Sequence, residues 1–275
     1  MSVPVSIHHI RDHYDQLSTY YRTLWGVHLH HGYWEDNEPQ SVAQVNLVKK
    51  LAGLAELAPS MRVLDVGCGM GGSSLWLAEH LDAAVAGVTL SEVQAKMASK
   101  NAERLGLEGQ VSFHLADASH LPFAGNCFDV VWIIECSEHL EDKRSFLRDC
   151  SRVLRRGGKL AICAWLKADA LSPEEEEAFI KPVCTGFLCP SLETMNNYSR
   201  WMEEAGLTVR HALDITSRVE KTWSLCTKIV RRPEVKLLVR FGDEHILNFV
   251  NAFETIQNAY SQGKMRYGMM VAEKR

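Results

Sequence analysis

The stretch VLDVGCGMGGSS, residues 63–74, decides the fold. Residues 63–66 are apolar except for Asp65 and predict a buried strand. A glycine-dense turn follows, and residues 73–80 predict a helix. Glycine lets the backbone turn sharply and lets a ligand come close, and a helix begins with free N–H groups at the positive end of its dipole. Such a strand, turn and helix predict a nucleotide-type pocket at the carboxyl end of a sheet.

The glycine spacing alone leaves two ligands open. Gly67, Gly69 and Gly72 fit the dinucleotide pattern G-x-G-x-x-G, which is a weak signal by itself. Asp65 lies two residues before the first glycine, where a carboxylate holds an ammonium or fixes the loop but repels a pyrophosphate. A dehydrogenase would also need an acidic residue about 20 positions further on, which is missing. The ligand is therefore expected to be cationic near the loop, and S-adenosylmethionine, with its ammonium and sulfonium, fits.

The bulk composition describes an ordinary globular chain of 275 residues with 46% hydrophobic residues. A net charge of -4 without a long basic run argues against nucleic acid as a partner. No apolar run approaches the roughly 20 residues of a membrane span, and the first residues lack the apolar core of a signal peptide, so a cytoplasmic location is expected. The 8 cysteines form no C-x-x-C pair, which favours buried free thiols over zinc ligands.

Two motifs carry a resemblance to a known family. The sequence D-V-G-C-G-x-G-G resembles motif I of the class I S-adenosylmethionine-dependent methyltransferases. Together with W-G-x-H-x-H-H-G-Y-W at residues 25–34, it resembles the gamma-tocopherol methyltransferase family of small-molecule enzymes. The resemblance covers about residues 14–165 and resumes weakly at the C-terminus. It implies an α/β fold, Rossmann-like, with a seven-stranded mixed sheet, helices on both faces and an α-helical cap.

The resemblance also implies the parts of one methyltransferase domain spanning residues 1–275. Residues 1–40 would be a lid over the cofactor and residues 41–165 the cofactor-binding core. Residues 166–190 and 217–262 would be cap elements over the substrate. The cofactor would be S-adenosyl-L-methionine, with S-adenosyl-L-homocysteine as its product.

The expected cofactor contacts follow the strand ends in order. Asp65 belongs to the strand before the glycine loop. Thr89 stands where many relatives carry an acidic residue, but T-L-S-x-x-Q at residues 89–94 resembles the tocopherol and cyclopropane relatives, and the resemblance implies that Gln94 reaches the ribose. Asp117 would face the adenine amino group, and Ala118 would leave room for the ring. The full expected set is Leu29, His30, Asp65, Gly67, Gly69, Thr89, Leu90, Gln94, Asp117, Ala118 and Glu135.

The segment Glu135-Cys136-Ser137-Glu138-His139 stands at the end of the fourth strand, where a doubly wound fold faces its ligand. His139 is the predicted general base, assisted by Glu138, because histidine can take a proton near neutral pH. The pair also suits the start of a helix. Tyr14, Tyr21 and Trp34 are expected to shape the substrate pocket.

The three histidines at positions 28, 30 and 31 are open to a simpler interpretation. They can form the polar edge of an aromatic plug as well as a lid. Metal binding is not expected, because no carboxylate or cysteine stands at ligand spacing beside them.

The remaining patterns predict the frame. Residues 6–25 and 41–57 predict helices, the second ended by Pro59. Residues 190–192 would cap a helix carrying Tyr198. Residues 217–262 are predicted to be mostly helical, with Leu237 and Phe241 among their apolar positions, and residues 265–272 form a last, antiparallel strand.

The acceptor of the methyl group is the open question. A partly apolar secondary metabolite is the first choice, with carbon, nitrogen and oxygen all open as the methylated atom, since function lies in the site rather than the fold. A prenylated phenol and a small amine of the glycine-derivative type are the alternatives, as is a protein that binds the cofactor without catalysis. The oligomeric state is not defined, with a homodimer as one option.

Overall fold

A seven-stranded mixed sheet is the frame of the computed structural model, which describes residues 3–233, 235, 239–240 and 244–275. The strand order is β3-β2-β1-β4-β5-β7-β6. Strands β1 to β5 pair in parallel, while β7 runs antiparallel to both β5 and β6. This confirms the expected sheet and its antiparallel last strand. The strands are β1 (Arg62–Val66), β2 (Ala84–Thr89), β3 (Val111–Leu115), β4 (Phe128–Ile134), β5 (Leu154–Lys167), β6 (Leu207–Asp214) and β7 (Met265–Lys274).

Helices cover both faces because alternate residues of each strand point to opposite sides. Val63 belongs to the apolar core that includes α2 and α3, whereas Leu64 belongs to the core that includes α5 and α8. The helices before β6 are α1 (Ile7–Leu24), α2 (Gln40–Leu54), α3 (Gly72–Leu81), α4 (Glu92–Leu105), η1 (Ser137–His139), α5 (Lys143–Val153), α6 (Pro173–Glu175), the π-helical η2 (Glu176–Ile180), α7 (Lys181–Gly186) and α8 (Met195–Glu204).

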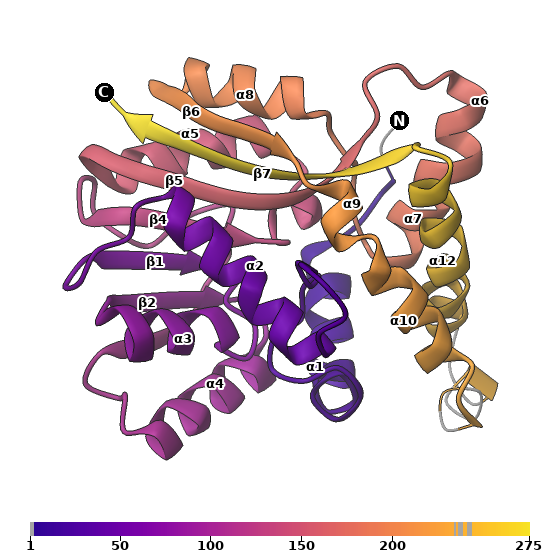
Figure 1. Ribbon diagram of the computed structural model, residues 1–275, viewed down its shortest axis with the longest axis horizontal. Helices are drawn as coiled ribbons and strands as arrows, with labels where there is room; N and C mark the ends of the chain where they lie inside the picture. The colour runs from indigo at the N-terminus through magenta and orange to yellow at the C-terminus, as the bar shows by residue number, and fades with distance from the viewer. Residues whose placement is uncertain (1–2, 234, 236–238, 241–243) are drawn as a thin grey trace.

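Three later helices, α9 (Thr216–Val219), α10 (Lys221–Val230) and α12 (Glu244–Ser261), stand with α6 and α7 beyond the end of the sheet toward which the parallel strands run (Figure 1). This agrees with the helical pattern predicted for residues 217–262. Leu237 and Phe241, assigned to the same helical region, lie outside the described residues. Among the helices that the structure describes, none is long and apolar enough to cross a membrane.

Two predicted helix ends were wrong. Helix α2 ends at Leu54 rather than near Pro59, and Glu56 then turns into the left-handed region with a φ of 50°. Helix α8 begins after Thr194, whose hydroxyl accepts a hydrogen bond from the Asn197 N–H, and not after residues 190–192. Thr194 is an ordinary N-cap residue, so the local signal was present but was read three residues too early.

Candidate active site

The glycine loop between β1 and α3 has the backbone that the sequence required. Gly67, Gly69 and Gly71 all have positive φ, at 78°, 53° and 82°. A Cβ built on Gly67 would also lie 2.5 Å from the side chain of Cys136 at the end of β4. Glycine is therefore needed at position 67 for two reasons: the backbone there is left-handed, and the ends of two strands approach closely.

Asp65 is buried in β1 and fixes the loop. Its carboxylate accepts a hydrogen bond of 2.6 Å from the hydroxyl of Ser74, in the first turn of α3. Burial raises the pKa of Asp65 to about 7. The residue thus ties the strand to the helix, and the buried carboxyl gains from any cation that binds beside it.

In the first turn of α4, shortly after β2, the side chain of Gln94 has a donor without a described partner. The hydroxyl of Thr89 donates to Gln94 Oε1 at 3.0 Å, but the buried Gln94 Nε2 has no hydrogen-bond partner among the described residues. A buried amide without a partner costs about 1–3 kcal/mol. An N–H group in this position is suited to an oxygen of a bound ligand, as expected for the ribose contact.

Asp117 stands after β3 and is only half-buried. Its Oδ1 accepts from the backbone N–H of Ser119 at 2.8 Å. A carboxylate offers more than one acceptor position, so Asp117 can accept from a ligand as well. Leu90 and Ala118 lie beside it on the same cavity wall.

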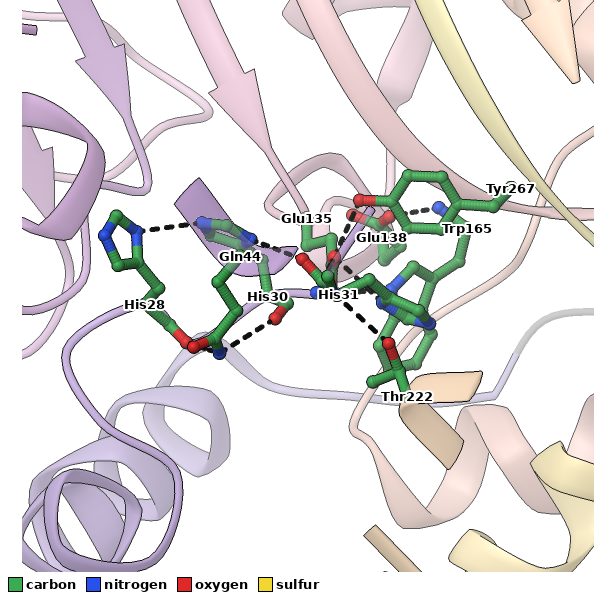
Figure 2. Close-up of polar contacts among 10 residues, drawn as sticks. His28, His30, His31, Gln44, Glu135, Glu138, Trp165, Thr222 and Tyr267 are labelled. Carbon is green, nitrogen blue, oxygen red and sulfur yellow. Dashed lines mark hydrogen bonds and ion pairs between the residues drawn. The ribbon is translucent and has the colours of Figure 1, made fainter. Parts of the chain in front are cut away.

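The segment between α1 and α2 closes on the glycine loop. The side-chain amide of Gln44 donates to the carbonyl oxygens of His28 and His30 at 2.6 and 3.3 Å (Figure 2). His30 Nδ1 donates to the His31 carbonyl, so its Nε2 accepts from His28 Nδ1 at 3.1 Å. A Cβ on Gly72 would lie 2.8 Å from the His28 ring. The segment therefore packs directly on the start of α3.

Glu135 anchors this segment to the sheet. Its Oε1 accepts from the His31 backbone N–H, from His31 Nδ1 and from the Tyr267 hydroxyl at 2.7–2.9 Å, and its Oε2 accepts from Trp165 Nε1 at 2.8 Å (Figure 2). Burial alone would raise the pKa of Glu135, but His31 outweighs it and holds the pKa at about 2. The ionised carboxylate is thus occupied by protein donors. Glu135 can therefore contact a cofactor only through its backbone, which is held in the left-handed region at a φ of 53°.

Two cavities meet at the end of the sheet. The loop cavity is lined by the glycine loop and by the strand ends of β2, β3 and β4, and the aromatic cavity by α1, α10, α12 and Trp165. All eleven residues expected to contact a cofactor line the loop cavity. The residues that line both cavities are Tyr14, Leu29, His30, Glu135 and His139.

His139 lies at this junction with a fixed ring. Its Nδ1 is 3.0 Å from the carbonyl oxygen of Leu188, which can only accept, so Nδ1 carries the proton. Its Nε2 then accepts from the Tyr14 hydroxyl at 2.8 Å. Burial lowers the pKa of His139, which keeps the ring neutral. The structure therefore presents the unprotonated Nε2 toward the junction, as a general base requires.

Glu138 is close to His139 in sequence but has a different environment. Its Oε1 accepts from the backbone N–H of Trp165 at 2.5 Å, and no described contact joins its carboxyl to the His139 ring. Burial, and the neighbouring Glu135, raise the pKa of Glu138 to about 8. At neutral pH the group is mainly a neutral carboxylic acid on the wall of the aromatic cavity. The Leu188 carbonyl, rather than Glu138, orients His139.

Trp34 does not join the pocket predicted for it. Tyr14 and Tyr21 line the aromatic cavity, whereas Trp34 lines neither cavity and its ring lies below Lys221 at 5.6 Å. The ring folds back over Gly32, where a Cβ would meet it at 2.7 Å. Only a tertiary contact distinguishes this direction from the expected one.

Sequence reasoning assigned no individual role to several residues of the aromatic cavity, although Trp223 and Phe249 fall within the predicted cap. His13, Phe187, Trp223 and Phe249 line it, and the Leu188 carbonyl orients the base. His13 shares a helix face with Leu17 and Tyr21 at i, i+4, i+8 spacing, and this pattern could have indicated from the sequence that His13 faces the cavity. Among the described residues, no group of three His, Cys, Asp or Glu side chains could hold a metal ion.

Comparisons with known proteins define the class. Residues 64–162 match a family described as "Methyltransferase domain". The chain is 35% identical over 216 residues to "Methyltransferase GfsG" of Streptomyces halstedii, covering 78% of this chain and 77% of the relative. It is 30% identical over 285 residues to the chloroplastic tocopherol O-methyltransferase of Arabidopsis thaliana, covering 96% and 81%. The chain therefore belongs to the class I S-adenosylmethionine-dependent methyltransferases that act on small molecules.

A solved structure extends the likeness to the whole chain. The geranyl diphosphate C-methyltransferase from Streptomyces coelicolor A3(2), crystallised with Mg2+, geranyl diphosphate and S-adenosyl-L-homocysteine, superposes with a TM-score of 0.79 at 18% identity. The superposition covers 99% of this chain and 100% of that one. The cofactor of this chain is S-adenosyl-L-methionine, and the unused amide of Gln94 and the open glycine loop fit it.

Proposed function

We propose that the chain transfers a methyl group to an uncharged, largely apolar small metabolite, with His139 as the general base. The observation that carries the proposal is the junction of the two cavities, where the unprotonated Nε2 of His139 is presented. S-adenosylmethionine supplies a methyl group activated by its positive sulfur. The loop cavity would hold the cofactor, and the aromatic cavity would hold the acceptor.

In this proposal the parts of the chain divide the work. Residues 41–165 bind the cofactor, residues 1–40 cover it and contribute α1 to the acceptor cavity, and residues 166–190 and 217–262 complete the enclosure of the acceptor. Asp65 supports the cationic end of the cofactor, and Gln94 and Asp117 bind its ribose and adenine. Holding two reacting groups in line and in contact supplies roughly 7–11 kcal/mol of rate advantage, so this enclosure is the main contribution of the protein.

His139 would remove the proton that the acceptor loses. The O–H or N–H bond of the acceptor breaks, its electron pair stays on the attacked atom, and the proton goes to His139 Nε2. The Leu188 carbonyl continues to accept from Nδ1–H and stabilises the resulting imidazolium. In the structure the Tyr14 hydroxyl donates to His139 Nε2. When the acceptor binds, its O–H or N–H would replace this hydroxyl at Nε2, and Tyr14 would help to position the acceptor. Glu138 would act as a neutral donor on the cavity wall.

The lining of the aromatic cavity supports an uncharged acceptor. It includes rings from Trp165, Phe187, Trp223, Phe249 and Phe253, and no lysine or arginine among the lining residues that the structure describes. The relative with geranyl diphosphate was crystallised with Mg2+, but the described lining of this cavity has no lysine or arginine for a diphosphate, and among the described residues no group of three His, Cys, Asp or Glu could hold a metal ion. A small hydrophilic amine would leave most of these rings without apolar contact.

A labelled-cofactor screen tests the proposal. The protein is incubated with methyl-labelled S-adenosylmethionine and fractionated metabolite extracts, and labelled products are identified by mass spectrometry. We expect label in a neutral, apolar product together with S-adenosylhomocysteine. Label confined to charged products, or no release of S-adenosylhomocysteine with any fraction, would reject it. Calorimetry with S-adenosylhomocysteine and NADH, in parallel, checks that the loop cavity binds the sulfur nucleoside.

A further inference from the structure

A chain of hydrogen bonds enters the aromatic cavity from the side of α1. The buried His13 has its Nε2 2.8 Å from the hydroxyl of Tyr21 and its Nδ1 2.8 Å from Nε2 of His245. His245 is half-buried near the start of α12, 232 residues away in the sequence. Residues of two helices far apart in the sequence thus hold the hydroxyl of Tyr21, a residue that lines the aromatic cavity.

The surroundings of His13 keep His13 and Tyr21, two members of this hydrogen-bond chain, uncharged. Its ring contacts Phe249 edge-on at 5.0 Å and Tyr14 at 5.2 Å. Burial, together with His245 and His139, lowers the pKa of His13 to about 3. Burial raises the pKa of Tyr21. At neutral pH the imidazole and the phenol are therefore both neutral.

We propose that Tyr21, held by His13 and His245, forms a second polar subsite that binds a neutral oxygen group of the acceptor, a hydroxyl or a carbonyl, apart from the atom that is methylated. The subsite rests on the proposed function only in taking the aromatic cavity as the acceptor site. A buried polar group in an apolar cavity contributes specificity because leaving it unpaired is costly.

The hydrogen-bond chain can serve either oxygen group. When the Tyr21 hydroxyl donates to His13 Nε2, His13 Nδ1–H donates to His245, and the tyrosine oxygen accepts from a ligand hydroxyl. When the chain is reversed, His13 Nε2–H donates to the tyrosine oxygen, whose own proton is then offered to a ligand carbonyl. A carboxylate or phosphate is disfavoured, because the ionised Glu135 lines the same cavity and none of the described lining residues is lysine or arginine.

The test compares probes that differ by one hydroxyl. Binding of pentylresorcinol, pentylhydroquinone and meta-pentylphenol to the protein saturated with S-adenosylhomocysteine is measured by calorimetry. We expect at least one diol to bind about 10-fold more tightly than the phenol, the size of one good neutral hydrogen bond. No preference for either diol in the wild-type protein would overturn the subsite.

Variants assign the preference to the hydrogen-bond chain. Tyr21→Phe should remove the diol preference while leaving the affinity for pentylphenol within about 2-fold, and His13→Gln should reduce it. Tyr33→Phe is the matched control, because Tyr33 lines neither cavity, and should keep the preference. A preference that survives in Tyr21→Phe overturns the proposal. Since binding is measured without turnover, a protein with the preference but no S-adenosylhomocysteine release would keep the subsite and reject the transfer reaction.

Discussion

The ring of His139 is held in one tautomer by the Leu188 carbonyl, and that single contact makes a strong prediction. His139→Ala should lower kcat by ~10²–10⁴-fold, the usual contribution of a general base, while the affinity for S-adenosylhomocysteine stays within about 3-fold. Turnover and calorimetry check the two halves. His80→Ala, a surface change on α3, is the control. Unchanged turnover in His139→Ala would mean that positioning alone drives the transfer.

Gln94 gives a second prediction at this scale. Gln94→Leu removes an amide whose nitrogen has no described partner but whose oxygen accepts from the buried Thr89 hydroxyl, so the fold should lose about 1–3 kcal/mol of stability from the hydroxyl left unpaired. If the nitrogen binds the ribose, affinity for S-adenosylhomocysteine falls about 10-fold. Calorimetry and thermal unfolding separate the effects. Gln16→Leu, at an exposed position on α1, should change neither; equal affinity in Gln94→Leu would remove the residue from the cofactor site.

Single residues divide into those that local pattern places and those that it does not. Asp65 and Asp117 stand in or just after a parallel strand, and parallel strand ends share one edge of the sheet, whereas Gln94, in the first turn of α4, was chosen from the resemblance to the family; all three line the loop cavity. Trp34 was assigned to the wrong place because the direction of its ring depends on a tertiary contact with Lys221. The His13–His245 pair was missed because a contact between residues 232 positions apart leaves no local signal. The role assigned to Glu138 as assistant of His139 likewise depended on side-chain directions that only packing determines.

At the scale of elements, the contact of the 25–34 segment with the start of α3 is testable. Gly72→Ala would place a methyl group 2.8 Å from the His28 ring and 2.9 Å from the Val27 carbonyl, so the segment must move away. Overpacking costs about 1–3 kcal/mol, and we expect about 10-fold weaker binding of S-adenosylmethionine by calorimetry. Gly109→Ala, where a Cβ meets nothing within 4 Å, is the matched control. Equal affinity in both variants would show that the segment does not cover the cofactor.

Most elements were predictable because periodicity and capping are local. The cap of α4 is such a local feature: the hydroxyl of Ser91, just before the helix, accepts from the Gln94 N–H at 3.1 Å. The end of α2 was predicted from Pro59, a known helix breaker. The helix actually ends earlier, where Glu56 adopts the left-handed conformation, and no sequence pattern predicts that turn. The packing of α12 against both α7 and α10 could be known only from the tertiary structure.

At the scale of the whole molecule, buried titratable groups of opposite kinds surround one junction. The pKa values of His13 and His28 are lowered from 6.5 to about 3, whereas those of Asp65 and Glu138 are raised from 3.8 and 4.5 to about 7 and 8. Below pH 6.5 the histidines of the unfolded chain bind protons, whereas the same histidines in the folded protein stay neutral, so the free energy of unfolding falls as pH falls. Above pH 4.5 the unfolded carboxyl groups release protons that the folded ones keep, so stability falls as pH rises.

The free energy of unfolding should therefore be greatest near pH 6.5 and should decline on both sides, because burial also lowers the pKa values of His30 and His139, so that more histidines than carboxyl groups titrate between pH 4.5 and 6.5. Each group contributes at most about 1.4 kcal/mol per pH unit within its own window. Urea unfolding from pH 4 to 9 measures the curve. Glu138→Gln, which keeps a neutral side chain at every pH, should flatten the decline between pH 6.5 and 8, whereas Glu141→Gln, at an exposed position on the same loop, should leave it unchanged. A decline of the same slope in Glu138→Gln and in the wild-type protein would mean that Glu138 ionises freely in the folded state, and its place as a neutral donor on the aromatic cavity wall would then be lost.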